Sequence, residues 1–209
     1  MTIDRILELA MDGKYLDKEE AVQLLKIENN SDEFYKLISA ANYMTRSEYK
    51  NKGLVFAQIG INAEPCSKNC KFCSMGKEHY SMENTWRKGV DTIISEVTTL
   101  IDQGIDDLFL MTTADYPFDK FLTISQKVRE ILPESIRFVA NIDDFDYQGA
   151  LKLKKVGFTG AYHINRLREG IDTTIQPETR INTLNAVKCS GLDLYYCVEP
   201  IGPEHSYEE

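Results

Sequence analysis

The chain has 209 residues, with 33 Asp or Glu against 24 Lys or Arg, so its formal net charge is −9. Hydrophobic residues make up 43% and charged residues 27% of the chain, which is typical of a globular protein and excludes a disordered or fibrous one. The acidic balance argues against a general nucleic-acid binder, and no apolar run approaches the roughly 20 residues that a membrane-spanning helix needs.

Residues 1–52 predict an N-terminal extension of three helices. Asp17 and Ser31 are typical helix N-caps, and they precede predicted helices over residues 19–27 and 32–45. The start of the chain carries acidic residues and lacks the basic start and apolar block of a secretory signal. We therefore expect a cytoplasmic protein.

Residues 53–209 predict a second domain in which an amphipathic helix, a glycine and a short β-rich run recur in that order. Apolar residues from Val90 to Ile101 have the helical period, Gly104 can cap that helix, and residues 107–113 indicate a buried strand. The same order continues in helices over 118–132, over 147–156 and from Pro177 to Gly191, and in strands over 136–142, 160–164 and 192–201.

These strands begin near residues 107, 136, 160 and 192, at spacings of about 29, 24 and 32 residues, which is the length of a βα unit. Their continuous apolar runs indicate strands that are covered on both faces. With residues 54–61 as the first strand, the sequence predicts an α/β fold of five parallel strands with crossover helices. We expect a partial TIM-type (βα) parallel barrel behind the helical extension.

Three of the five cysteines follow the first predicted strand in a C-x3-C-x2-C pattern: Cys66, Cys70 and Cys73. The loop at the carboxyl end of a strand faces the active-site mouth in a parallel α/β fold. Three thiolates there can hold three irons of a 4Fe4S cluster and leave the fourth iron open. The alternatives are a zinc site completed by His79 and a set of three buried thiols.

The string from Asn62 to Ser74, with the aromatic Phe72 directly before Cys73, resembles the radical S-adenosylmethionine (SAM) enzymes. Together with the following His79-Tyr80, it is most similar to their biotin synthase-like branch. That branch includes methylornithine synthase, the iron-only hydrogenase maturase that shares this fold, and lipoyl synthases of the two-component kind. The resemblance extends over the helical extension and the strands.

The resemblance implies two cofactors, a 4Fe4S cluster and SAM. One electron from a reductant such as flavodoxin or ferredoxin would cleave SAM at the open iron. The resulting 5′-deoxyadenosyl radical would take a hydrogen atom from a small-molecule substrate. Neither a nucleic acid nor a membrane is expected as a partner.

The resemblance also implies residues that bind SAM. Phe72 resembles the aromatic residue whose backbone contacts the adenine edge, although it can equally shield the cluster. Where the family usually has a Gly-Gly-Glu-like turn after the second strand, this chain has Thr112, Thr113 and Asp115. These residues offer oxygens to the SAM ammonium group, or they cap the next helix.

Further SAM contacts are implied after the fourth and fifth strands. Arg168 lies in a Leu-Arg-x-Gly context like that of the arginine that binds the SAM carboxylate, and its alternative is an ordinary surface arginine. His163 and Asn165 are candidates for the ribose hydroxyls. Ile201 lies in a segment that resembles the family's adenine-binding region.

Acidic residues follow the third strand at the same mouth. Asn141, Asp143 and Asp144 would suit a cationic or amino-bearing substrate, or they cap the following helix.

Biotin synthase itself carries a second iron–sulfur cluster whose cysteines lie on strands two, three and five. Here strands two and three contain no cysteine, Cys189 falls on the last predicted helix, and Cys197 is out of register. We therefore do not expect biotin synthesis by that route, and we expect both cysteines to be buried core thiols. Three hypotheses remain: a radical SAM enzyme that rearranges or cleaves a small molecule, sulfur insertion of the lipoyl type, and a zinc- or cluster-stabilised non-catalytic domain.

A complete barrel of this branch needs more strands than the five predicted here. Ser206 and Glu209 have the S-x-x-E spacing of a helix capping box. We therefore expect the 209 residues to be the N-terminal portion of a larger, split or truncated enzyme. A partner subunit or a further C-terminal part would complete its barrel.

Overall fold

The computed structural model describes residues 1–197 and 199–209, which form two compact units. One unit comprises Met1–Gly53 and Ile201–Glu209, and the other comprises Leu54–Pro200. Among the described residues, no helix combines the length and the apolar character needed to cross a bilayer.

The smaller unit contains the three expected helices: α1 (Ile3–Met11), α2 (Lys18–Leu25) and α3 (Asp32–Glu48). Asp17 accepts a hydrogen bond from the Glu20 backbone and forms a reciprocal capping box with it, and Ser31 caps α3 by accepting from Phe34. Both predicted N-caps are therefore confirmed.

The C-terminal residues of this unit adopt the predicted capping-box geometry. The backbone N–H of Ser206 donates to Glu209 Oε2 (2.7 Å), and the backbone N–H of Glu209 donates to Ser206 Oγ (3.3 Å). Lys26 Nζ pairs with Glu208 Oε1 at 2.7 Å, which ties this segment to the end of α2.

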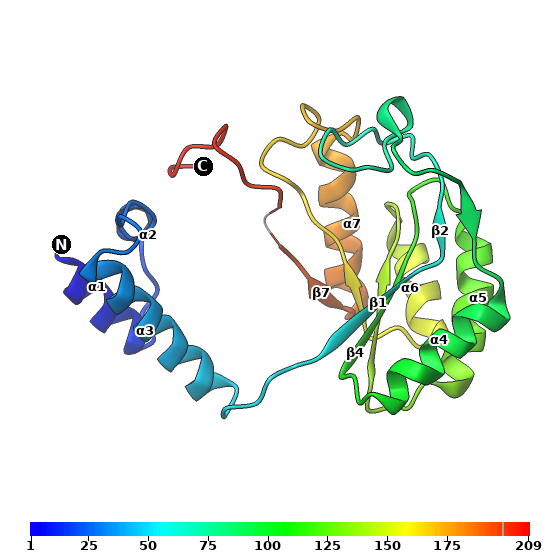
Figure 1. The fold of residues 1–209 in the computed structure, drawn as a ribbon, viewed down its shortest axis with the longest axis horizontal. Coiled ribbons are helices and arrows are strands. Elements are labelled where there is room, and N and C mark those ends of the chain that lie inside the picture. The colour runs from blue at the N-terminus through cyan, green and yellow to red at the C-terminus, as the bar shows by residue number, and fades with distance from the viewer. Residues whose placement is uncertain (198) are drawn as a thin grey trace. The chain divides into compact units, whose positions relative to one another are not determined.

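The larger unit is built on one parallel sheet with the strand order β1-β4-β5-β6-β7 (Figure 1). The five strands are β1 (Phe56–Gly60), β4 (Asp107–Met111), β5 (Arg137–Asn141), β6 (Gly160–Tyr162) and β7 (Asp193–Tyr195). The predicted parallel order is confirmed. The last strand was predicted too long, because β7 ends at Tyr195. Val198, within that prediction, lies outside the described residues.

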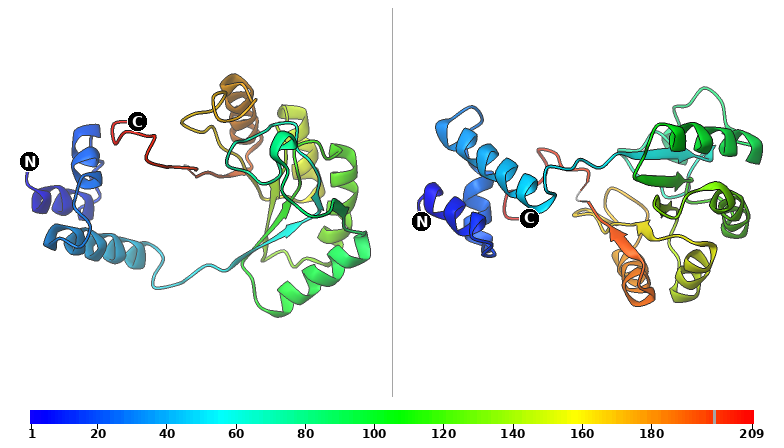
Figure 2. Two further views of the ribbon diagram at one scale, coloured as in Figure 1. Left: turned by 45° about the horizontal axis from the view of Figure 1, so that its top comes forward. Right: turned by 90° about the horizontal axis from the view of Figure 1, so that it is seen from below.

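Four helices connect these strands and lie along the outer side of the curved sheet (Figure 2), so the unit is a partial (βα) barrel. They are α4 (Val90–Asp102), α5 (Phe118–Ile131), α6 (Tyr147–Val156) and α7 (Pro177–Ser190). Gly157 (φ +102°) and Gly191 (φ +71°) end α6 and α7 in the left-handed conformation that glycine adopts without strain.

An insertion between β1 and α4 carries the cysteine pattern. It contains the two-residue strands β2 (Asn62–Ala63) and β3 (Trp86–Arg87), which pair antiparallel, and the short 3-10 helix η1 (Lys77–His79).

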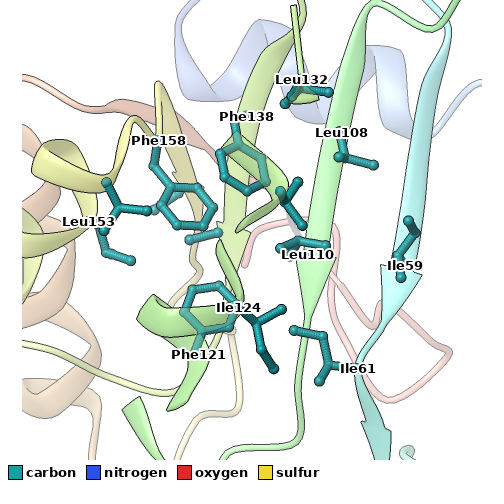
Figure 3. Close-up of a cluster of buried hydrophobic side chains, with 14 of the residues drawn as sticks. Ile59, Ile61, Leu108, Leu110, Phe121, Ile124, Leu132, Phe138, Leu153 and Phe158 are labelled. Carbon is teal, nitrogen blue, oxygen red and sulfur yellow. The ribbon is translucent and has the colours of Figure 1, made fainter. Parts of the chain in front are cut away.

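The hydrophobic core lies between the sheet and these helices (Figure 3). Alternate strand residues such as Ile59, Leu110 and Phe138 face the helices, and the Phe138 and Phe158 rings stack with centroids 4.0 Å apart. Cys189 lies on α7 and is exposed, and Cys197 is half-buried. The prediction that both are buried core thiols is therefore wrong, because the side of α7 that carries Cys189 faces solvent.

We expect Phe138→Ala to lower the free energy of unfolding by about 3–5 kcal/mol, because it leaves a cavity beside the Phe158 ring. Urea unfolding followed by circular dichroism measures the loss. Ile131→Ala on α5 is the control, because Ile131 is 40% exposed and its truncation should cost less than about 1 kcal/mol. Equal losses in the two variants would contradict this assignment of the core.

Candidate metal centre

The loop that carries Cys66, Cys70 and Cys73 follows β2 and is closed by its own backbone. Cys66 N donates to Met75 O (2.7 Å), Lys77 N donates to Cys66 O (2.9 Å), and Cys73 N donates to Cys70 O (2.9 Å). Asn69 adopts a positive φ of 45°, a conformation that asparagine tolerates better than most residues. These bonds fold the three cysteines into one compact turn.

His79 holds this turn from one side. Its Nε2 lies 3.1 Å from the carbonyl oxygen of Cys70 and 2.9 Å from that of Cys73, so this nitrogen is the donor. Gly76 leaves room for the ring, which a Cβ at that position would meet. In the zinc hypothesis His79 would be the fourth ligand. Because its Nε2 instead donates to the loop carbonyls, the structure disfavours that hypothesis.

Residues from the ends of other strands anchor the loop to the sheet. After β4, the Asp115 carboxylate accepts hydrogen bonds from Ser67 N and Ser67 Oγ, both at 2.6 Å. After β6, Thr174 N donates to Lys68 O (2.9 Å). After β5, Asp143 pairs with Lys68 Nζ at 3.0 Å. The loop is therefore fixed by three separate crossover connections.

The three cysteines line a cavity of about 630 Å³ at the carboxyl edge of the sheet. Polar and charged groups from every part of the sheet face the same space. Its lining includes Asn62, Lys68, Phe72, Thr112, Thr113, Asn141, Asp143, Tyr162, Arg166, Arg180 and Glu199.

The donor set fits an iron–sulfur cluster. Burial raises the pKa of the Cys70 thiol, and the positive charge of Arg166 opposes that rise. Among the described residues, no three His, Cys, Asp or Glu side chains converge as ligands of one metal ion. A cubane cluster binds each cysteine at a different iron, so it needs three sulfurs around one cavity rather than three sulfurs on one ion.

Some residues predicted to bind SAM lie at this cavity. Phe72, Thr112 and Thr113 line it, and Thr113 is already bonded to Asn62, whose Oδ1 accepts from Thr113 N (3.0 Å). Asp115 is instead engaged by Ser67 at the back of the cysteine loop. Asp115 thus holds the loop, which sequence reasoning did not foresee.

The residues predicted after β6 are placed differently. The guanidinium of Arg168 pairs with Asp172 at 2.8 Å, and Arg168 is not among the described residues that line the cavity. His163 is buried and its Nε2 lies 2.8 Å from Asp144 Oδ1. The backbone carbonyl of Asn165 accepts from Tyr196 Oη. Ile201 belongs to the smaller unit.

Sequence reasoning missed the two arginines that supply positive charge to the cavity. Arg166 and Arg180 line it, with side chains 16% and 10% exposed, and both contact Glu169, whose side chain is 1% exposed. Arg180 Nη1 also pairs with Asp144 Oδ2 at 3.3 Å. For Arg180, the sequence showed only an arginine within the predicted helix that begins at Pro177. Whether a charged residue lies on the buried face of a helix is hard to infer from sequence.

The charge state of this network is set by its contacts. Burial alone would raise the pKa of Asp144, but the His163 hydrogen bond and the Arg180 charge outweigh it and lower that pKa to about 2. Burial lowers the pKa of His163. Asp144 therefore stays ionised at neutral pH and holds the Arg180 guanidinium in place.

The known proteins that this chain resembles are radical SAM enzymes. No family model matches the chain. It is 24% identical over 200 residues to biotin synthase of Desulforudis audaxviator and 28% identical over 208 residues to that of Clostridium botulinum. These alignments cover 92% and 90% of this chain but 60% and 62% of the relatives. Cyclic dehypoxanthine futalosine synthase of Halalkalibacterium halodurans is 28% identical over 143 residues, which cover 64% of this chain and 36% of that protein.

Solved structures share the fold. Methylornithine synthase (PylB) superposes with a TM-score of 0.82 at 18% identity, over 92% of this chain and 58% of that one. HydG, a maturase of the FeFe-hydrogenase, superposes with a TM-score of 0.79 at 19% identity, over 93% and 45%.

These matches confirm the resemblance to biotin synthase-like radical SAM enzymes and the partial-barrel fold. The relatives are radical SAM enzymes, for which a 4Fe4S cluster and SAM are general features. The chain spans about three fifths of the length of the curated biotin synthases compared above.

We expect Asp115→Asn to loosen the cysteine loop, because the two Ser67 bonds go to different carboxylate oxygens and one of these becomes an NH2 group, which cannot accept. If the free energy of opening the loop falls by about 1 kcal/mol, the loop thiols should react roughly fivefold faster. The measurement is the rate of thiol modification of the metal-free protein, in a Cys189→Ser, Cys197→Ser background.

Asp119→Asn, an equal charge change in the first turn of α5, is the control and should leave the rate unchanged. Equal rates for the Asp115 and Asp119 variants would contradict the anchoring role of Asp115.

Proposed function

We propose that this chain carries the cluster- and SAM-binding part of a radical SAM enzyme that acts on a small molecule. The observation that carries the proposal is that Cys66, Cys70 and Cys73 line one cavity together with buried arginines and strand-end polar groups. The relatives, all radical SAM enzymes, support the same conclusion. A low-potential reductant such as flavodoxin or ferredoxin and a cytoplasmic location belong to this proposal.

In this proposal the three thiolates hold the cluster, which with SAM supplies a 5′-deoxyadenosyl radical that abstracts hydrogen from substrate. The chain contributes position and charge. The His79 and Asp115 contacts keep the cysteine turn rigid. Phe72, 43% exposed beside Cys73, offers an apolar surface that excludes water from the cavity.

We assign recognition of the SAM carboxylate to Arg180 in place of Arg168. Arg180 lines the cavity, and its buried Nε makes no hydrogen bond in the described structure. Asp144 lies 3.3 Å from Nη1 and Glu169 lies 3.7 Å from Nε, but a guanidinium carries five N–H donors and can still offer some of them to a ligand carboxylate. Arg168 pairs with Asp172 and is not among the described residues that line the cavity. Thr112 and Thr113 remain the proposed partners of the SAM ammonium group.

The surroundings of Asp143 favour the hypothesis of an amino-bearing substrate. Its carboxylate lines the cavity, and its buried Oδ1 makes no hydrogen bond in the described structure, while Lys68 pairs with Oδ2. An ammonium group at Oδ1 would satisfy that oxygen. The described strands β4 and β5 contain no cysteine, so sulfur insertion by an auxiliary cluster would need ligands from outside these strands.

Anaerobic reconstitution with iron and sulfide tests the cluster. We expect a brown protein with broad visible absorbance that forms 5′-deoxyadenosine when it is reduced in the presence of SAM. Serine at Cys66, Cys70 or Cys73 should abolish both signals, because three thiolates are needed. Cys189→Ser and Cys197→Ser are the matched controls and should keep the cluster. A colourless protein with tightly bound zinc and no SAM cleavage would refute the proposal.

We expect Arg180→Gln to weaken SAM binding roughly tenfold or more, because it removes a charge-assisted hydrogen bond worth about 1.5–3 kcal/mol. Calorimetric titration of the oxidised, reconstituted protein measures the dissociation constant. Arg168→Gln is the matched control and should change it less than about twofold. A larger loss in the Arg168 variant would restore the sequence-based assignment.

A further inference from the structure

Arg166 lies closer to the cysteine turn than its place in the sequence indicates. Its guanidinium carbon is 5.2 Å from the centroid of the Phe72 ring, and Phe72 separates Cys70 from Cys73 in the chain. Arg166 also lines the same cavity as the three cysteines. A fixed positive charge therefore lies over the segment that carries the proposed cluster ligands.

This charge is held rigidly. Glu169 Oε2 accepts a hydrogen bond from the Arg166 backbone N–H (3.2 Å) and lies 3.3 Å from Arg166 Nη1. Thr173 Oγ1 donates to Glu169 Oε1 at 2.6 Å and fixes the carboxylate. The Arg166 Nε is buried and makes no hydrogen bond in the described structure.

Burial strengthens the electrostatic effect of Arg166 and Glu169 on groups that lie nearby. The side chain of Glu169 is 1% exposed and that of Arg166 is 16% exposed, so mobile ions screen them far less than they screen surface residues. A nearby positive charge favours the more negative, reduced form of a cluster, and a nearby carboxylate disfavours it.

We propose that Arg166 and its buried partner Glu169 set the reduction potential of the cluster at Cys66, Cys70 and Cys73, with Arg166 raising it and Glu169 lowering it. This inference rests on the proposed function. It goes further because it assigns a positioning and electrostatic role to two residues that need not touch SAM.

A redox titration of the reconstituted cluster without SAM, monitored by electron paramagnetic resonance, tests this inference. In Arg166→Gln, we expect the ratio of reduced to oxidised cluster at a fixed potential to fall about tenfold, equal to about 59 mV for a one-electron couple. In Glu169→Gln, we expect the ratio to rise. If the two variants shift this ratio in opposite directions, the charges of Arg166 and Glu169 set the potential. A merely structural role would not give the two shifts opposite signs.

Two control variants separate the effect of the Arg166 charge from the effect of its shape and from that of a charge exposed at the surface. Arg166→Lys keeps the charge but loses the planar contact with Phe72, so it should stay within about threefold of the wild-type ratio. Lys71→Gln removes the same charge from the cysteine loop at a side chain that is 66% exposed. Solvent screens that position, so its ratio should also stay within about threefold.

The outcomes distinguish this inference from the proposed function. A wild-type chain that assembles no cluster refutes both. A wild-type cluster with an unchanged ratio in Arg166→Gln, or shifts of the same sign in Arg166→Gln and Glu169→Gln, overturns the role of the pair alone. If Arg166→Gln does not hold a cluster, Glu169→Gln decides, and the absence of an upward shift overturns the inference.

Discussion

The parallel direction of all five strands in the larger unit is the constraint on which the site depends. Because parallel strands end at the same edge, the connections after β4, β5 and β6 all meet the loop that follows β2. Asp115, Asp143 and Thr174 come from these three connections, and each contacts Ser67 or Lys68. The cysteine turn, which has little regular structure of its own, is therefore positioned by the sheet.

Buried carboxylates provide the second level of organisation. Glu169 lies between Arg166 and Arg180, and Asp144 holds Arg180 from the other side. Burying an arginine costs free energy unless a partner compensates its charge, and these two carboxylates supply that compensation while leaving both Nε groups without hydrogen bonds. The two guanidinium groups at the cavity are thus held in fixed positions by these ion pairs.

The sequence predicted the elements well and the site unevenly. Periodicity and glycine caps identified the four α-helices α4 to α7 of the larger unit, because the caps at Gly157 and Gly191 act locally. The cysteine spacing likewise identified the loop. Arg180 was missed because its role arises from burial against Asp144, a contact across 36 residues that no local pattern reports. Arg168 was preferred on a local motif, but the structure gives it a neutralising partner four residues away.

Aromatic side chains occupy part of the sheet face that points away from the helices. The Phe109 ring, in the middle of β4, packs against Phe56 and Tyr195, with centroids 5.5 and 5.2 Å apart. The Arg137–Asp107 ion pair lies beside them and contacts the Tyr195 ring. Phe109 is buried within this group at 5% exposure, whereas Phe56 at its edge is 59% exposed. In the proposed function, a substrate would lie between the Phe109 ring and the cysteine loop, because the cavity opens on that side of the cluster of rings.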